Sequence, residues 1–191
     1  MTTASLRRAV ALALAASPLV AGPAFAGAAE DAFASFRDFC GVPQGDYQAA
    51  LDKADAGGWK HIDFTSDTMN GVKITDKASR NKVAGAEAMA LSVTRGTAGK
   101  PGDVVNVTTC TVTAKADFSA VAKLTGEWLA LAPHDSSASK VGFRYTPNGA
   151  SATAVADSAY QAAAAANGYV MLSIADKGNG LAMIDMVKLK K

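Results

Sequence analysis

The chain has 191 residues, of which 19 are basic and 17 acidic, and 49% are hydrophobic but only 7% aromatic. This composition indicates a folded domain rather than a disordered segment, with a core of few large side chains. The near balance of charge provides no strong positive field, so nucleic-acid binding is not expected.

The first 26 residues predict a secretory signal peptide. Arg7 and Arg8 precede an apolar run at residues 10–16, and residues 24–26 form the A-x-A pattern that signal peptidase cleaves. Prolines interrupt the apolar stretch, which is shorter than the roughly 20 residues of a membrane span, so no transmembrane anchor is expected after cleavage. We therefore expect a periplasmic or secreted protein with a single domain over residues 27–191.

Two helices are predicted at the start of that domain. Three phenylalanines share one face of a helix over residues 28–39, and a Pro/Gly turn ends it. Asp46 is a favourable N-cap for a second helix over residues 47–56. The Gly-Gly-Trp sequence at residues 57–59 predicts that the second helix stops there, with the tryptophan folded back on its last turn.

Strands dominate the middle of the chain. Residues 61–64 suit a short strand, whereas the polar residues 70–82 predict an exposed loop. Alternating side chains predict a strand over residues 86–94, and residues 96–102 read as a loop. Residues 104–113 are rich in β-branched side chains and give the strongest strand prediction of the chain.

The second half predicts one long helix and two hairpins. Asp117 is the expected N-cap of a helix that runs to about Leu131, and Asp157 is the expected cap of a short alanine-rich helix. The hairpins pair residues 141–146 with 151–155, and residues 169–175 with 181–189. The predicted fold class is α+β, with an N-terminal helical hairpin, a mainly antiparallel sheet of about six strands and one further long helix, the helices lying on one face.

Cys40 and Cys110 are the only cysteines. Disulfides form and persist in exported proteins, which favours a bond between the two. A reactive thiol would require a neighbouring cysteine or histidine, or a helix N-terminus, whereas Cys40 is predicted at a helix C-terminus. The pair is therefore predicted to be a structural disulfide.

His61 and His134 are the only histidines, and neither has metal-binding spacing to another histidine or to a cysteine. Asp63 and Asp135 are close to them in sequence, but a metal site would have to be assembled by the fold. The polar string at residues 134–137 (HDSS) resembles a catalytic triad only as letters, because triad members come from separate segments.

The remaining motifs do not assign an activity. No G-x-S-x-G pattern is present, and the glycine-rich residues 96–100 and 178–180 suit hairpin turns better than phosphate loops. Trp59, Trp128 and Tyr169 could line a cleft, although packing is the simpler interpretation. We therefore assign no catalytic, cofactor-binding or metal-binding residue and expect no cofactor.

The N-terminal pattern resembles that of a known group of proteins. Its elements are Phe36-x-x-Phe39-Cys40, a Pro/Gly turn, Asp46, an alanine-rich helix and Gly57-Gly58-Trp59. They resemble an uncharacterised group of small exported proteins of Gram-negative bacteria that begin with F-x-x-x-C and then A-x-x-x-G-W. The resemblance covers residues 33–59 and the later Cys110, and it implies an exported location and a cystine but no activity.

These observations favour a non-enzymatic binding or envelope-associated domain, whose partner would be an unknown protein or envelope component. Two alternatives stay open: a cell-envelope hydrolase with a site assembled in three dimensions, and a small protein inhibitor of an envelope enzyme. A concave pocket that collects His61 or His134 together with carboxylates would favour the hydrolase.

Overall fold

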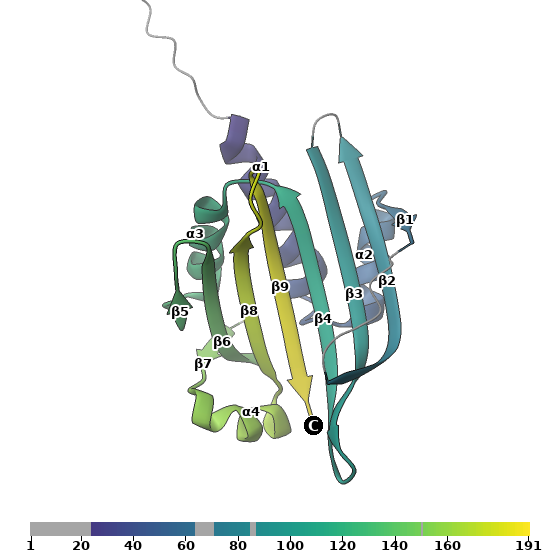
Figure 1. Cartoon of the computed structure of the whole chain (residues 1–191), viewed down its shortest axis with the longest axis vertical. Helices are drawn as coiled ribbons and strands as arrows, with labels where there is room; N and C mark the ends of the chain where they lie inside the picture. Colours follow the sequence, from purple (N-terminus) through teal and green to yellow (C-terminus); the bar gives the residue numbers. More distant parts are fainter. Residues whose placement is uncertain (1–23, 64–70, 85–86, 150) are drawn as a thin grey trace, which may run out of the picture.

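A large sheet and three helices form two layers (Figure 1). The structure is a computed structural model and describes residues 24–63, 71–84, 87–149 and 151–191. The expected signal peptide falls outside these residues except for residues 24–26, which begin the first helix. Among the described helices, none has both the length and the hydropathy that crossing a membrane requires.

The first predicted helix is confirmed and ends in an unusual turn. Helix α1 (Ala24–Phe36) continues into a π-helical turn, η1 (Arg37–Gly41). The amide of Val42 donates a 2.7 Å hydrogen bond to the carbonyl of Arg37, which closes the wider π-helical ring.

The second predicted helix is confirmed over the same residues. In α2 (Tyr47–Ala56), the Asp46 carboxylate accepts a 2.8 Å hydrogen bond from the amide of Ala49, which is the predicted N-cap. Gly58 adopts a positive φ of 76°, and the amide of Trp59 bonds back to the last turn of α2. Both ends of α2 are therefore fixed by local sequence, as predicted.

Nine strands form one antiparallel sheet within the described residues. They are β1 (Lys60–Ile62), β2 (Val72–Ala84), β3 (Glu87–Lys100), β4 (Asp103–Lys115), β5 (Asp135–Ser136), β6 (Lys140–Asn148), β7 (Ser151–Ala154), β8 (Tyr169–Asp176) and β9 (Leu181–Lys190). Their order across the sheet is β1-β2-β3-β4-β9-β8-β6-β5, with β7 paired to β6. The two predicted hairpins, β6–β7 and β8–β9, are confirmed.

The prediction of about six strands is wrong, because the sheet has nine. The expected loop over residues 70–82 lies largely within β2, which pairs with β3 along its length and owes its conformation to that pairing rather than to its own polar side chains. Residues 96–100 extend β3 instead of leaving it, so the turn to β4 is confined to Pro101 and Gly102.

Helix α3 (Phe118–Leu129) begins as predicted, because the Asp117 carboxylate accepts a 2.6 Å hydrogen bond from the amide of Ala120. Helix α4 (Tyr160–Ala166) follows a 3₁₀ turn, η2 (Asp157–Ala159). Asp157 does not cap this helix, which corrects the prediction. Its carboxylate pairs instead with the Arg144 guanidinium, because a hydrogen bond between two charged groups is stronger than one to a neutral backbone amide.

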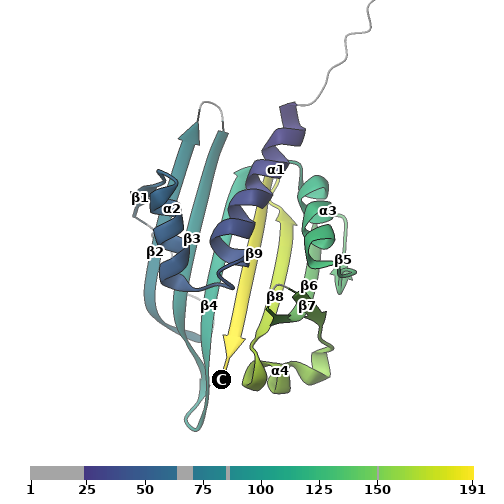
Figure 2. The same cartoon turned by 180° about the vertical axis from the view of Figure 1, so that it is seen from behind.

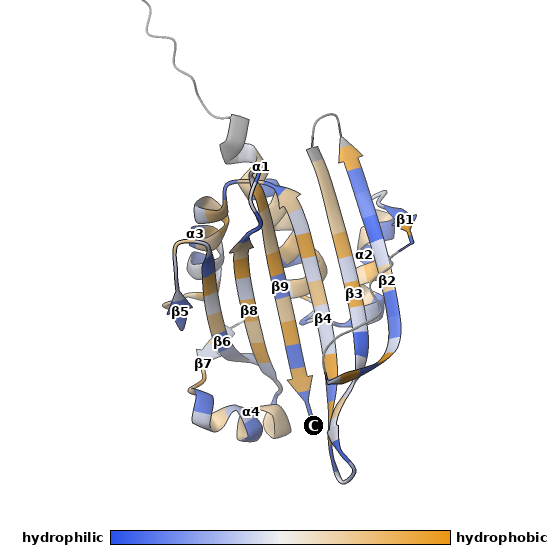
Figure 3. Ribbon diagram, viewed as in Figure 1, coloured by the Kyte–Doolittle hydropathy of each residue, from blue (hydrophilic) through white to orange (hydrophobic). Residues whose placement is uncertain are grey.

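The two faces of the sheet differ in what lies on them. Helices α1, α2 and α3 lie behind the strands in Figure 1 and in front of them in Figure 2, so they pack on one side, which we call the covered face. The other side, the open face, is contacted by α4 at the ends of β8 and β9. Side chains alternate between the faces, and Figure 3 shows this as polar and apolar bands along β3 and β4.

The core lies between the covered face and the helices. Its largest fully buried side chains come from α1, α3 and five strands and include Phe36, Leu91, Val93, Val112, Val121, Phe143, Leu172, Ile174, Ile184 and Met186. Cys40 of η1 and Cys110 of β4 meet within this layer, with their sulfur atoms 2.02 Å apart and their Cα atoms 5.5 Å apart. The predicted pair therefore lies at disulfide distance.

Candidate functional site

The two histidines lie at opposite edges of the sheet. His61 belongs to β1, the first strand in sheet order, and its Nδ1 atom lies 3.1 Å from the Arg80 guanidinium. Its Nε2 atom lies 3.4 Å from the carboxylate of Asp63. His134 precedes β5, the last strand, and its Nε2 atom lies 3.4 Å from Asp157. The fold therefore separates the two histidines, and they do not form a common site.

The HDSS string forms a strand and a turn at the sheet edge. Asp135 and Ser136 pair with β6, and the Ser137 hydroxyl donates a 3.3 Å hydrogen bond to the carbonyl of Lys140. The Ser137 hydroxyl therefore stabilises the backbone of this turn. Within the described residues, no group of three or more His, Cys, Asp or Glu side chains could hold a metal ion.

The glycine-rich segments have structural roles. Gly178 donates its amide to the Asp176 carboxylate at 2.7 Å in the turn between β8 and β9. Gly96 lies inside β3, where an added β-carbon would collide with the carbonyl of Lys73 on β2. The close approach of two strands therefore accounts for the glycine at position 96.

The aromatic candidates are packing residues, as the simpler interpretation expects. Trp59 is 4% exposed and lies edge-on to Phe39, with ring centroids 5.1 Å apart. Trp128 packs edge-on against Phe33 and Phe36 of α1, which joins α3 to α1. Tyr169 is buried where β8 meets α4.

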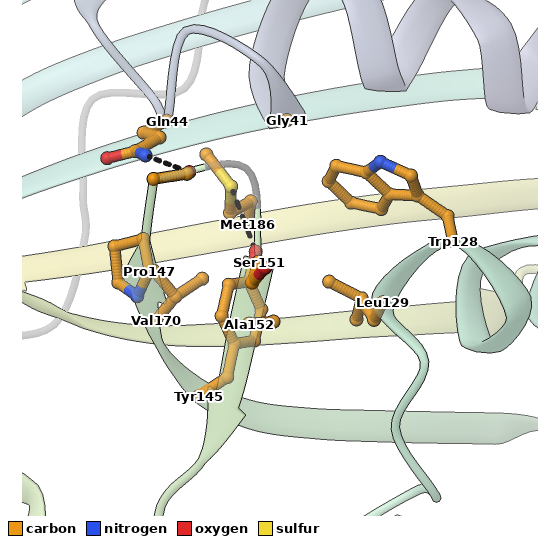
Figure 4. A pocket seen from close by; sticks show the side chains of 11 residues that line it. Gly41, Gln44, Trp128, Leu129, Tyr145, Pro147, Ser151, Ala152, Val170 and Met186 are labelled. Atoms are coloured by element: carbon orange, nitrogen blue, oxygen red, sulfur yellow. Dashed lines mark hydrogen bonds between the residues drawn. The ribbon is translucent and has the colours of Figure 1, made fainter.

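Trp128 also borders a small pocket on the covered face (Figure 4). The pocket has a volume of about 40 Å³ and lies between the turn after η1, α3 and the β6–β7 hairpin. The Gln44 side chain bridges that turn to the hairpin by a 3.3 Å hydrogen bond to the carbonyl of Gly149. Burial raises the pKa of Tyr145, whose hydroxyl points to Met186. A space of this size holds a few water molecules rather than a substrate.

The open face has a different composition, because a row of small polar residues crosses it. Cross-strand pairing aligns, from β2 to β6, Ser79, Ser92, Thr111, Asp185, Ser173 and Gly142. We call these six residues the central row. Asp185 is its only charged member, and the others have short side chains or none, so the middle of the open face is low compared with its borders.

Two hollows adjoin the central row. The apolar hollow has a volume of about 370 Å³ and is lined by Ile62, Ser79, Ala90, Leu91, Ser92, Thr111, Thr113 and Met183. That volume lies within the range of roughly 300–1,000 Å³ that is usual for small-molecule sites. The charged hollow has a volume of about 170 Å³, and its lining includes Asp135, Lys140, Gly142, Arg144, Met171, Ser173, Asp185 and Val187.

Asp185 separates the two hollows. Its Oδ1 atom accepts a 2.7 Å hydrogen bond from the Thr111 hydroxyl, and Thr111 lines the apolar hollow. Burial raises the pKa of Asp185, while this hydrogen bond and the charges of Lys177 and Lys140 act in the opposite direction. The site can therefore offer a desolvated carboxyl group beside an apolar surface.

Sequence reasoning missed Asp185 although a signal was present. It is the single acidic residue of β9 and lies between Ile184 and Met186 in the apolar first part of that strand. Alternation would have placed it on the face opposite to those two residues. The sequence alone does not show that five other strands place short side chains, or none, in the same row as Asp185.

No protein family, curated protein or solved structure matches the chain. The resemblance to the group of small exported Gram-negative proteins therefore stays a prediction, and the open face supplies the basis for a functional proposal.

Proposed function

We propose that the protein is an exported, non-enzymatic binding domain that uses the open face of its sheet to bind a protein or an envelope component. The observation that carries this proposal is the pair of adjoining hollows on that face. An antiparallel sheet can expose one face to water, and such a face typically carries polar side chains. Here the central row has short side chains, and apolar residues such as Met171, Met183 and Val187 lie beside it.

Export is supported by two features. The N-terminal 26 residues have the charge, apolar run and cleavage pattern of a signal peptide. The Cys40–Cys110 pair at disulfide distance suits the oxidising periplasm or exterior. Mass spectrometry of the protein from a periplasmic fraction should give a chain that begins at Gly27 and gains two hydrogen atoms on reduction. A full-length chain with free thiols would contradict export.

The methionines provide a test of the binding face. Met171 and Met183 line the hollows of the open face, whereas Met89 and Met186 pack on the covered face. In protein labelled with ¹³C at the methionine methyl groups, soluble envelope fractions should shift the NMR signals of Met171 and Met183 and leave the other two unchanged. Shifts confined to Met89 and Met186, or no shift with any fraction, would refute the proposed face.

A cell-envelope hydrolase is the second candidate, and one observation favours it. Asp135 and Asp185 line the same hollow, and burial raises the pKa of Asp185, as in a general acid. Such an enzyme should release soluble fragments from purified cell-wall material and lose that activity in Asp185→Asn. Absence of release by the unmodified protein would favour the binding domain.

A further inference from the structure

We infer that Asn179, in the turn between β8 and β9, is a site of spontaneous deamidation, where the chain converts this asparagine to aspartate and isoaspartate through a succinimide. The inference does not depend on the proposed binding function. Three observations carry it: the backbone conformation of the turn, the free amide of Gly180, and the contrast with the other Asn-Gly pairs that the structure describes.

The reaction needs only the chain and water. Solvent hydroxide removes the proton of the Gly180 amide, and the nitrogen attacks the Cγ atom of Asn179. The new C–N bond closes a five-membered succinimide, and the side-chain nitrogen leaves as ammonia after it takes a proton from water. Water then adds to either ring carbonyl and opens the ring, which gives aspartate or isoaspartate. No electrons are transferred, so no oxidant or reductant is consumed.

The turn already has half of the geometry that ring closure requires. Within residues 178–181, the amide of Leu181 donates a 3.0 Å hydrogen bond to the carbonyl of Gly178. The central residues, Asn179 and Gly180, have φ angles of 55° and 72°, which define a type I′ turn. Ring closure aligns the Gly180 nitrogen with the β-carbon of Asn179, at the ψ of about −120° that a type II′ turn has at its first central residue.

One rotation connects these two turn types. Both have a positive φ at the first central residue, so turning the peptide plane between Asn179 and Gly180 brings the nitrogen to the β-carbon. The second central residue must change the sign of its φ in this rotation, and a glycine does so without steric cost. The hydrogen bond between Leu181 and Gly178 is common to both turn types and can stay in place.

The attacking amide is free to react. Asn179 and Gly180 are both exposed, so hydroxide can reach the peptide bond between them. Among the described residues, none accepts a hydrogen bond from the Gly180 amide, and none donates one to the Asn179 carbonyl. The rotation and the attack therefore break no backbone hydrogen bond.

The other Asn-Gly pairs lack these features. The chain has four, and the asparagine of one, Asn70, lies outside the described residues. Asn167 ends α4 with a φ of −110°, and the amide of Gly168 donates a 2.9 Å hydrogen bond to the carbonyl of Ala163. Asn148 ends β6 and pairs within the β6–β7 hairpin, also without a positive φ. For a residue with negative φ, the ψ needed for ring closure is outside the allowed regions, so both segments must first rearrange.

Modification should alter a contact outside the turn. The carbonyl of Gly180 accepts a 2.9 Å hydrogen bond from the amide of Ala116, which precedes Asp117, the N-cap of α3. In isoaspartate the backbone runs through the former side chain, so it is one methylene longer directly before Gly180. The Gly180 carbonyl should therefore shift, and the amide of Ala116 should exchange faster with solvent.

The test incubates the folded protein in mildly alkaline ¹⁸O-labelled water and then digests it in ordinary water. Trypsin cleaves after Lys177 and Lys188, and the peptide between them has Asn179 as its only side-chain amide. Its mass should rise by the difference between an amide and an acid, with one ¹⁸O atom incorporated. Chromatography should separate two products, the aspartyl and isoaspartyl peptides.

The same chain unfolded in guanidinium chloride is the matched control. In the folded protein, Asn167 should react at least about fivefold more slowly than Asn179, the scale of one backbone hydrogen bond. In denaturant, Asn148, Asn167 and Asn179 should react at similar rates, because each precedes a glycine. No mass gain at Asn179, a faster reaction at Asn148 or Asn167 in the folded protein, or the same ranking in denaturant would overturn the inference.

Asn179→Gly is the matched variant for the effect on α3. Glycine adopts the positive φ of position 179 and removes the side-chain amide. After incubation, the Ala116 amide of the unmodified sequence should exchange at least about fivefold faster in hydrogen exchange followed by NMR, and that of Asn179→Gly should not change. Faster exchange in both proteins, or in neither, would refute the link between the turn and α3.

Discussion

Strand β9 shows both faces of the sheet in one stretch of chain. Ala182, Ile184 and Met186 are buried under the helices, whereas Met183 and Asp185 border the hollows of the open face. The covered face is filled by large apolar side chains, and the open face has a row of short polar ones. Core packing and the proposed binding surface therefore fall on alternate residues of one strand, and substitutions one residue apart should have unlike effects.

The largest effect is expected from the cystine that ties the helices to the covered face. The paired Cys40→Ala and Cys110→Ala substitutions should lower the free energy of unfolding by about 4 kcal/mol, because the bond closes a loop with a sequence separation of 70. Urea denaturation of the variant and the unmodified protein measures the difference. An unchanged midpoint would mean that the helical layer holds to β4 without the bond.

Two methionines of β9 compare the faces directly. Met186→Ala should cost roughly 3 kcal/mol, since the side chain is 1% exposed and its loss leaves a cavity. Met183→Ala should cost under about 1 kcal/mol because that side chain is half-buried beside the apolar hollow. Thermal and urea unfolding of both variants provide the measurement. Equal costs would show that the open face is as tightly packed as the covered one.

Gly41 tests the closest packing of the helical layer. A β-carbon at this position would lie 2.5 Å from the Trp128 ring, so Gly41→Ala should cost about 2 kcal/mol through overpacking. Gly126→Ala is the control in α3, where the new methyl group would lie 3.5 Å from Phe143 and should be tolerated. In thermal unfolding followed by circular dichroism, Gly126→Ala should have a higher melting temperature than the unmodified protein, because alanine favours the helix over glycine by about 1 kcal/mol.

The smallest effect on stability is expected at Asp185. Because burial raises its pKa in the folded state above the ordinary value of 3.8, the folded protein holds this proton more tightly than the unfolded chain. The resulting stability is present below the ordinary pKa and is lost as the pH rises through the folded pKa. Asp185→Asn should therefore be roughly 0.5 kcal/mol more stable at neutral pH, the scale of polar surface substitutions.

Unfolding curves of Asp185→Asn at several pH values check this expectation. The difference from the unmodified protein should shrink on acidification. A clear loss of stability at neutral pH would instead make Asp185 a structural residue, and the contrast between the two faces would be weaker than we describe.

Local signals made parts of the fold predictable. Asp46 and Gly58 fix the ends of α2, and Asp117 fixes the start of α3, because each acts through hydrogen bonds within its own turn or through its own backbone angles. The predicted signal peptide and the presence of two cysteines were sufficient to predict the Cys40–Cys110 pair.

Non-local contacts explain what was missed. Strand β2 has the polar composition of a loop and becomes a strand through its pairing with β3. The central row joins residues from six strands, and only the sheet order reveals which of them are neighbours. The histidines attracted attention by their rarity, yet the fold separates them, whereas Asp185 was inconspicuous until its neighbours were known.

The strand order also has a consequence for biogenesis. The edge of β4 that is not paired with β3 pairs with β9, the most C-terminal described strand. Because a chain is synthesised from its N-terminus, β1–β4 can join the part of the sheet formed by β5–β8 only after β9 has been made. Until then, β4 has an unpaired edge that can recruit other chains. Cys40 and Cys110 both precede β9 and can pair during that interval, anchoring the first helix to β4. Removal of β9 should therefore yield two half-sheets that aggregate rather than a shortened but folded domain.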